Sequence, residues 1–523
     1  MRLDIPQSFN VATYFVDRHL AEGRDAKVAI ECGDERVTYA ELLERVNRAG
    51  NALKKLGLRR EERVALLLFD TPAFAYCFFG AIKAGLIPVP MNTLLKPREY
   101  EYMLNDMRAR VLVVSEGLLP QIAAISAGNL QYLEKIVVSG AAPPGTSSLE
   151  SLIHGSPAEL KAEETSKDDA AFWMYSSGST GFPKGCVHLH HDMVVTSECY
   201  AKAVLGIRED DRCYSVAKLF FAYGLGNGLY FPLAVGATTI LWPGSPSPPN
   251  ITGVVERHRP TLFFSVPSNY SSLLAYQRED GREPDFSSVR WAVSAGEALP
   301  AALYQRFKQR FNVEILDAIG STEALHMFIA NRPGAVKPGS SGQVIPGYEA
   351  RIVDESGNEV PVGEVGNLLV KGDAVCAYYW NQHEKTKDTI QGHWLRTGDK
   401  YYRDADGYYF YVGRSDDMLK VKGMWVSPVE IEAALIEHES VQEAAVIGYS
   451  DGNELIKPAA YVVLRTGLEA NERAAAELKD YLKSRLASHK CPQHLEFVAE
   501  LPKTATGKIQ RFKLRQAANN SAR

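Results

Sequence analysis

Short apolar runs alternate with amphipathic stretches over the first four hundred residues of the chain. "VALLLF" (64–69) and "AAFWMYS" (170–176) have the length and composition of buried strands. The stretch before the first of them begins with Thr38 and Glu41 in capping-box spacing, places apolar residues at helical intervals and stops at Gly57. Repetition of this pattern predicts an α/β fold with largely parallel sheets. Ligands bind at the carboxyl ends of parallel strands, so the loops that follow strands are the candidate sites.

The last hundred residues follow a different order. A helical pattern at 427–438 leads into two strand-like runs, and a second helical pattern at 472–487 precedes a basic, glycine-containing segment. About a hundred residues of α+β pattern are enough for a separate domain. We place the boundary in the polar run 414–417, which predicts a large N-terminal domain over 1–415 and a small, mobile α+β domain over 416–523.

Composition narrows the class of protein. The 523 residues exceed what one hydrophobic core supports, and the net charge of -5 leaves no electrostatic footprint for nucleic acid. Seven cysteines without a C-x-x-C pair favour free thiols in a reducing compartment over a structural zinc site. The apolar runs are too short for a signal peptide or a bilayer span. These features predict a cytoplasmic protein that binds neither nucleic acid nor membrane.

The loop after the strand at 170–176 combines glycines, hydroxyl side chains and one lysine. Glycines allow backbone N–H groups to converge on an anion, serine and threonine add donors, and lysine adds positive charge. A Walker A loop requires Gly-Lys-Ser/Thr, but Pro183 precedes Lys184 and Gly185 follows it. The pattern therefore predicts a phosphate loop of another kind. Its candidate residues are Ser176, Ser177, Gly178, Ser179, Thr180, Gly181 and Lys184.

A possible metal motif follows this loop. His188, His190 and Asp192 have the His-x-His-x-Asp spacing of some dinuclear zinc hydrolases, but Met193 stands where those sequences usually carry a further histidine. The same residues fit a strand end, with Asp192 as the N-cap of a helix. We therefore favour a strand–turn–helix over a metal site.

Six motifs in order resemble those of the adenylate-forming superfamily, which contains acyl- and aryl-CoA synthetases, luciferases and peptide-synthetase adenylation domains. Two further segments, at 217–233 and 320–328, resemble benzoate-CoA ligases in particular. The resemblance covers almost the full chain. The six motifs are "YSSGSTGFPKG" (175–185), "SAGEAL" (294–299), "DAIGSTE" (317–323), "WLRTGD" (394–399), "GRSDDMLKVKG" (413–423) and "PKTATGK" (502–508).

The resemblance implies a two-step reaction. A carboxylate and MgATP give an acyl-adenylate and diphosphate, and the thiol of CoA then displaces AMP. It implies that the 176–184 loop holds the β- and γ-phosphates, that Thr322 bonds the α-phosphate and that Glu323 carries the Mg²⁺, which favours carboxylate oxygen. Asp399 would bind the ribose hydroxyls with help from Arg414. The other implied ATP and AMP contacts are Gly296, Glu297, Ala298, Asp317, Gly320 and Ser321.

The C-terminal motifs imply a catalytic lysine and a hinge. By resemblance, Lys508 enters the site during adenylation and bridges carboxylate and α-phosphate oxygens. It would also be a target of a lysine acetyltransferase and deacetylase, since acetylation removes its charge. Asp416 matches the hinge position, and Lys420 and Gly423 would lie along the path of the CoA thiol.

The remaining motif residues imply an aryl pocket. Aromatic walls suit a small flat ring, whereas a fatty acyl chain needs a long apolar tunnel. The expected substrate is benzoate or a simply substituted benzoate, although Met327 stands where benzoate relatives carry isoleucine and His326 could be an ordinary wall residue. An adenylation enzyme that loads an aryl acid onto a carrier protein is the alternative, and a monomer or homodimer is expected. The implied pocket residues are Phe221, Ala222, Tyr223, Gly320, His326 and Met327.

Overall fold

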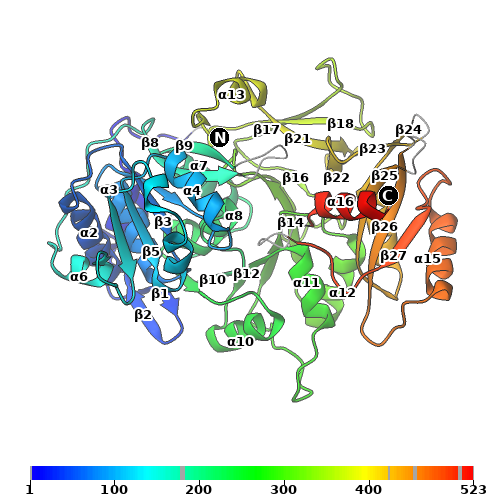
Figure 1. Cartoon of the computed structure of the whole chain (residues 1–523), viewed down its shortest axis with the longest axis horizontal. Coiled ribbons are helices and arrows are strands. Elements are labelled where there is room, and N and C mark those ends of the chain that lie inside the picture. The colour runs from blue at the N-terminus through cyan, green and yellow to red at the C-terminus, as the bar shows by residue number, and fades with distance from the viewer. Residues whose placement is uncertain (1–2, 177–182, 422–423, 451–455, 504–508, 522–523) are drawn as a thin grey trace.

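The computed structural model describes residues 3–176, 183–421, 424–450, 456–503 and 509–521. Figure 1 shows a large N-terminal part, coloured blue to yellow, and a smaller C-terminal part in orange and red. The main apolar clusters follow this division, because three of them contain buried residues between Val11 and Tyr409 and two contain only residues between Leu419 and Leu514. The predicted α/β class with a large N-terminal and a small C-terminal domain is confirmed. The boundary at 415/416 and the mobility of the smaller domain stay predictions.

The largest sheet has nine strands in the order β16-β15-β14-β13-β12-β10-β11-β1-β2. Its central pairs are parallel, and antiparallel strands close both edges. The central strands β11 and β12 are buried along their whole length, as expected for a parallel sheet covered on both faces. The strands are β1 (Val28–Cys32), β2 (Glu35–Thr38), β10 (Arg212–Ser215), β11 (Thr238–Leu241), β12 (Leu262–Ser265), β13 (Trp291–Ser294), β14 (Ile315–Gly320), β15 (Met327–Ala330) and β16 (Gln343–Val344).

A second sheet, in the order β4-β3-β5-β6-β7, is parallel throughout. The helix before it starts as predicted, because Thr38 Oγ1 accepts from the backbone N of Glu41 (3.2 Å) and Thr38 N donates to Glu41 Oε2 (2.8 Å). That helix, α2 (Tyr39–Lys55), packs against α3 (Pro72–Lys83). The strands are β3 (Arg63–Leu67), β4 (Ile87–Pro90), β5 (Val111–Ser115), β6 (Lys135–Ser139) and β7 (Ser147–Ser148).

The strand that leads into the predicted phosphate loop belongs to a small antiparallel sheet. β8 (Ala170–Ser176) pairs with β9 (Lys184–Leu189), and β9 pairs with β19 (Tyr378–Tyr379). The prediction of a strand at 170–176 is confirmed, but this strand does not belong to a parallel sheet. The two ends of the predicted loop are thereby held side by side, since Ser176 and Lys184 are paired across β8 and β9.

The prediction that Asp192 caps a helix is wrong by one position. Helix α7 (Asp192–Thr196) begins at Asp192 itself, and the cap residue is His191, which makes no side-chain cap bond. The physical reason is that the Asp192 carboxylate is turned back toward the strand, where it accepts from the backbone N of Leu189 (3.1 Å) and faces His188.

A fourth sheet, in which every pair is antiparallel, completes the N-terminal part, and helices cover the sheets. Its strands are β17 (Glu349–Val353), β18 (Gly366–Lys371), β20 (Ile390–Gln391), β21 (Trp394–Arg403) and β22 (Tyr409–Arg414). The other α-helices of this part are α1 (Arg18–Ala21), α4 (Pro97–Asp106), α5 (Leu119–Ala123), α6 (Leu149–His154), α8 (Ala222–Leu225), α9 (Phe231–Val235), α10 (Pro248–His258), α11 (Pro267–Ala275), α12 (Ala301–Phe311) and α13 (His383–Thr389).

The C-terminal part has its own sheet and helices. A β25-β26-β27 sheet is flanked by three helices and a hairpin, and Ser427 Oγ caps α14 by accepting from the backbone N of Glu430 (3.1 Å). In Figure 1 the last helix, α16, lies between this sheet and the larger part. The elements are β23 (Leu419–Val421), β24 (Met424–Val426), α14 (Pro428–Glu437), β25 (Val441–Ser450), β26 (Ile456–Leu464), α15 (Glu472–Arg485), β27 (His494–Phe497) and α16 (Arg511–Ser521).

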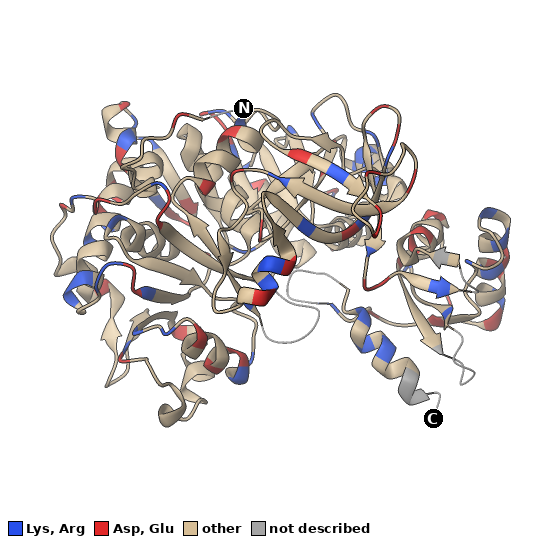
Figure 2. Ribbon diagram, turned by 90° about the horizontal axis from the view of Figure 1, so that it is seen from above, with Lys and Arg blue, Asp and Glu red and all other residues tan. Residues whose placement is uncertain are grey.

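Figure 2 shows that Lys and Arg lie interspersed with Asp and Glu over both parts of the molecule. This mixture agrees with the small net charge of the sequence. Among the described residues, no helix combines the length and apolar character needed to span a bilayer.

Candidate active site

A cleft of about 3810 Å³ runs between the two parts and is lined by residues of both. Many of the residues singled out in the sequence meet on its wall, although they come from strand ends and loops far apart along the chain. The candidate site residues that line it are Ser176, Lys184, Phe221, Gly296, Glu297, Ala298, Gly320, Ser321, Thr322, Glu323, Asp399, Arg414 and Asp416. Ser177, Gly178, Ser179, Thr180, Gly181, Gly423 and Lys508 lie outside the described residues.

Glu323 is the anionic centre of one end of the cleft. Its Oε1 accepts from Ser176 Oγ (3.1 Å) and from the Tyr379 hydroxyl (2.7 Å), and it lies 3.9 Å from Lys184 Nζ. Burial alone would raise the pKa of Glu323, but the Tyr379 hydroxyl, the Lys184 ammonium and the Ser176 hydroxyl together hold it below its usual value. A buried carboxylate is therefore kept ionised at neutral pH next to the phosphate-loop lysine.

Tyr379 was not identified from the sequence, although it contacts both Lys184 and Glu323. Its ring lies 4.4 Å from Lys184 Nζ, a cation–π contact, and its hydroxyl donates to Glu323. No local pattern indicates this residue, because it reaches the site through the pairing of β19 with β9.

His188 has a structural role that explains its place in the histidine-rich run. Its Nδ1 lies 2.8 Å from Asp192 Oδ2 and its Nε2 lies 2.8 Å from the Thr322 carbonyl oxygen. The ring is fully buried and stacks on Phe172 at 5.3 Å. The Asp192–His188 pair thus fixes the backbone of the residue before Glu323. Among the residues that the structure describes, no group of three or more histidine, cysteine or acidic side chains is arranged to hold a metal ion.

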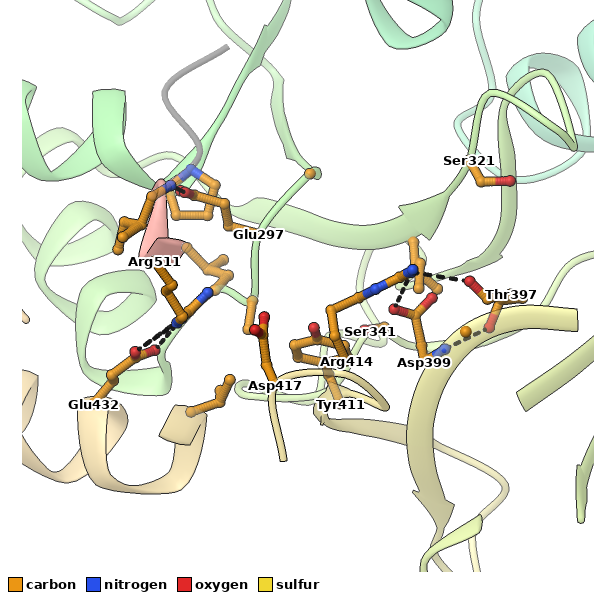
Figure 3. A pocket seen from close by; sticks show the side chains of 18 of the residues that line it. Glu297, Ser321, Ser341, Thr397, Asp399, Tyr411, Arg414, Asp417, Glu432 and Arg511 are labelled. Atoms are coloured by element: carbon orange, nitrogen blue, oxygen red, sulfur yellow. Dashed lines mark hydrogen bonds and ion pairs between the residues drawn. The ribbon is translucent and has the colours of Figure 1, made fainter. Parts of the chain in front are cut away.

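Asp399 and Arg414 form a second polar group on the wall of the cleft (Figure 3). Arg414 Nη1 donates to Asp399 Oδ1 (3.0 Å) and to the Thr397 carbonyl oxygen (2.9 Å). Gly398 has φ of 78° and a Cβ there would lie 2.8 Å from Arg414 Nη2, so the turn requires glycine. The carboxylate and guanidinium are held at the cleft wall, in a position where they can bind a diol or another polar group.

Asp317 lies behind the cleft wall instead of lining it. It is 6% exposed, on β14, and burial holds the pKa of its carboxyl well above the usual range. Its neighbours Ala318 and Gly320 on the same strand do line the cleft. Asp317 is therefore a buried carboxyl group whose neutral form is favoured by its surroundings.

The predicted aryl-pocket residues divide into two groups. Phe221 and Gly320 line the cleft, whereas Ala222, Tyr223, His326 and Met327 are packed in the protein behind it. Gly320 is the pair partner of Met327 across β14 and β15, and a Cβ at Gly320 would lie 2.4 Å from the His326 carbonyl oxygen. The backbone at this point is open toward the cleft because no side chain fits at Gly320.

His326 sits in an aromatic cage. Its ring centroid lies 4.4 Å from that of Phe231, 5.3 Å from Tyr200 and 5.9 Å from Tyr223. Burial lowers the pKa of His326 to about 3, so the ring is neutral. Neither ring nitrogen makes a hydrogen bond of normal geometry to a described group, and the nearby Tyr223 backbone offsets the effect of burial only in part.

The sequence did not indicate one contact between the two parts and two ion pairs within the C-terminal part. The backbone N of Ile509, the residue after Lys508, donates to Glu297 Oε1 (3.2 Å). Arg511 donates to both oxygens of Glu432 (2.7 and 2.8 Å), and Arg515 is paired with Asp417. Figure 3 shows Glu297 and Arg511 side by side on one wall. Ile509, the residue that directly follows the glycine–lysine motif, thus contacts the adenine-motif segment.

Lys420 does not take part in this wall. It lies exposed on β23 and is not among the residues that line the cleft. Its predicted place on the path of the CoA thiol stays a prediction, as do the functional roles of the other motif residues.

The fold and site define a two-part α/β enzyme with a large, partly polar cleft between the parts. The AMP-binding enzyme family model matches residues 17–380, and the model of the AMP-binding enzyme C-terminal domain matches residues 430–508. The chain belongs to the AMP-binding enzyme family, and the predicted superfamily is confirmed.

Individual relatives are similar over nearly the whole chain. The benzoate–CoA ligase of Thauera aromatica is 49% identical over 517 residues, which cover 98% of this chain and 97% of the relative. The 4-hydroxybenzoate–CoA/benzoate–CoA ligase of Rhodopseudomonas palustris is 44% identical and covers 98% of this chain and 94% of its own. The crystal structure of an anthranilate CoA ligase in complex with anthranoyl-AMP superposes with a TM-score of 0.96 at 47% identity, covering 99% of both chains.

Proposed function

We propose that the protein is an ATP-dependent aryl acid–CoA ligase. It converts benzoate, or a simply substituted benzoate, with ATP and CoA into the aryl-CoA thioester, AMP and diphosphate through an aryl-adenylate. The observation that carries the proposal is that the Lys184–Glu323 pair, Phe221 and Gly320 all line one cleft. The full-length similarity to benzoate– and hydroxybenzoate–CoA ligases supports it.

Adenylate formation joins two anions, so the site must neutralise charge without reorganising during the reaction. Lys184, with the hydroxyl of Ser176, would bind the triphosphate end of ATP, while Asp399 and Arg414 would bind the ribose. Fixed donors of this kind also orient the α-phosphate toward the incoming carboxylate. Thr322 is suited to the α-phosphate because its backbone is fixed by His188.

Glu323 fits the requirements of a Mg²⁺ ligand. It is a hard carboxylate kept ionised at the cleft wall, and the hydroxyls and ammonium around Oε1 hold its orientation. A bound Mg²⁺ would neutralise part of the triphosphate charge. The residues of this chain would then hold the reacting groups in place and exclude water.

The aryl ring would lie between Phe221 and the open backbone at Gly320, in front of the cage around His326. The ring of Phe221 would give edge or face contacts to an aryl ring, and the packed residues around His326 behind the wall would leave little length for an acyl chain. A diphosphate-release screen over a panel of aromatic and aliphatic acids, with and without CoA, tests this assignment. Release that depends on a carrier protein instead of CoA would favour the alternative enzyme class.

Substitution of Met327 is expected to change the choice between aryl acids. Met327 is 2% exposed and pairs with Gly320, so a change in its size alters the space in front of that glycine. One methylene-sized difference in such a pocket is worth about 1–3 kcal/mol. Met327→Ile is expected to favour unsubstituted benzoate, and Met327→Ala to favour meta- or para-substituted acids. The measurement is the ratio of kcat/KM values for benzoate and 4-hydroxybenzoate; unchanged ratios in both variants would exclude Met327 as a pocket residue.

Asp416→Pro is expected to permit adenylate formation and to block the thioester step. Asp416 lies in a turn in which the backbone N groups of Asp417 and Met418 both donate to the Arg414 carbonyl oxygen (3.0 and 3.2 Å), and its own N donates to no described acceptor. Proline removes no bond there, but it fixes φ and opposes the rotation that a hinge needs.

The control for the hinge is Asp416→Ala, which leaves the backbone free and should behave like the wild type in both steps. Proline at this position of a turn also restricts the preceding residue, so the melting temperature of both variants must be measured. Normal single-turnover thioester formation in a folded proline variant would show that Asp416 is not the pivot.

A further inference from the structure

A buried ion pair lies behind the aryl side of the cleft. Lys218 Nζ is 4.0 Å from Asp70 Oδ2, and the two side chains are 16% and 6% exposed. Neither residue lines the cleft. Lys218 falls within the 217–233 segment, but neither it nor Asp70 is among the candidate site residues named from the sequence. Burial of an ion pair costs several kcal/mol per ion before the attraction is counted. An apolar pair would therefore have been a less costly way to fill this space.

Lys218 and Asp70 hold one backbone segment from two directions. Lys218 Nζ donates to the carbonyl oxygens of Trp242 (2.6 Å) and Gly244 (2.8 Å), which follow β11. Asp70 Oδ1, which follows β3, accepts from the backbone N of Leu219 (3.2 Å). The segment that begins at Lys218 is thus tied to the ends of strands in both parallel sheets.

This segment carries the aromatic wall of the cleft. Phe220 and Phe221 both line it, with ring centroids 4.3 Å apart. The backbone N of Phe221 donates to the Lys218 carbonyl oxygen (3.0 Å), and a Cβ at Gly224 would lie 2.0 Å from that same oxygen. The chain is therefore closed tightly between Lys218 and Gly224, so a displacement of Lys218 must be passed on to the two phenylalanines.

We propose that Lys218 and Asp70 are positioning residues for the acid substrate, which fix Phe220 and Phe221 against its ring. The inference rests on the proposed function, because it takes Phe221 as a wall of the acid site. Neither residue lines the cleft in which ATP and the acid would bind, so loss of the pair should weaken binding of the acid and leave binding of ATP unchanged.

The role of the Lys218–Asp70 pair can also be tested through the dependence of KM for the acid on pH. The groups that face Asp70 are Lys218, Cys32 and Tyr214. Burial raises the pKa of Asp70 to about 6 and that of Cys32 to about 11, and it holds that of Tyr214 above its usual range. Between pH 5 and pH 8 Asp70 is therefore the group in this cluster that changes charge. Its protonation, as pH falls through about 6, removes the counterion of Lys218.

The experiment compares Lys218→Met, Lys218→Arg and Asp70→Asn in the full chain, with the acid that the wild type turns over best. Lys218→Met is expected to raise KM for the acid about tenfold or more, since a shift of about 1 Å in a bound group has effects of this size. KM for ATP should stay within about twofold, and Lys218→Arg should restore most of the loss because it keeps a cation and donors for the two carbonyls. An equal rise of both KM values, or no rise for the acid, would overturn the proposal.

Asp70→Asn provides the second readout, because an amide oxygen can still accept from Leu219 N while the charge is lost. In the wild type KM for the acid should rise as pH falls below about 6, and in Asp70→Asn the profile should be flat. Identical profiles would overturn the proposal even if Lys218→Met failed to fold. If the preferred acid is not aromatic, the proposed function fails, while the effect of Lys218 on that acid can still be measured.

Discussion

Replacement of Lys508 by alanine is expected to slow aryl-adenylate formation by roughly 10²- to 10³-fold, the range found when one preorganised donor to a developing charge is removed. Thioester formation from supplied aryl-adenylate should stay within a few-fold of the wild type. Single-turnover measurements of the two half-reactions, with ATP and acid in one case and adenylate and CoA in the other, give the comparison.

The expectation for Lys508 rests on the motif and on its described neighbour. The backbone N of Ile509 donates to Glu297, which lies in the segment that would contact adenine. By the motif, the charge of Lys508 would act on the phosphate and carboxylate oxygens in the first step and would have no role once the adenylate exists. Acetylation also removes the charge, so acetylated protein should reproduce the defect of the alanine variant.

Lys503 is the matched control for Lys508. It belongs to the same basic segment, but its Nζ is paired with Glu443 at 2.7 Å within the C-terminal part. A partly exposed pair of this kind contributes about 1 kcal/mol or less to stability, so Lys503→Ala should leave both half-reactions nearly unchanged. An equal loss in both half-reactions for Lys508→Ala would contradict a role confined to adenylation.

Elements that depend on neighbouring residues could be predicted from the sequence. The capping box at Thr38 and Glu41 and the strand at 170–176 require only local spacing and an apolar run, and both are found in the structure. The motif residues could be named for the same reason, since each motif is a short stretch with its own pattern. These motifs line one cleft because of the order in which the sheets are connected. Local sequence patterns do not specify that order.

Contacts between distant residues were the part that could not be predicted. Tyr379 reaches Glu323 across 56 positions, and Arg511 reaches Glu432 across 79. Asp192 shows the limit even at short range, because a helix cap and a partner for His188 require the same carboxylate. In the structure the Asp192 carboxylate pairs with the buried His188 and does not cap the helix. This outcome depends on the ring contacts of His188, which are formed only in the folded protein.

Glu323→Gln is expected to reduce adenylate formation by roughly 10²- to 10³-fold, comparable with the loss of a group that stabilises charge in the transition state. The amide has the shape of the carboxylate, and its oxygen can still accept from Ser176 and Tyr379, so the geometry of the site should be kept. Only the negative charge is lost. Lys184 would then have no carboxylate at 3.9 Å, and Mg²⁺ would lose a preferred ligand.

The readout that separates a metal ligand from a structural residue is the dependence on Mg²⁺. ATP–diphosphate exchange measured over a series of Mg²⁺ concentrations should require more Mg²⁺ in Glu323→Gln than in the wild type. Tyr379→Phe is the control, because it removes one donor to Glu323 and leaves the carboxylate in place, so its loss should be about tenfold or less and its Mg²⁺ dependence normal. If Glu323→Gln kept the Mg²⁺ dependence of the wild type while activity fell, Glu323 would act through its contacts with Lys184 and Tyr379 and would not be a ligand of the metal.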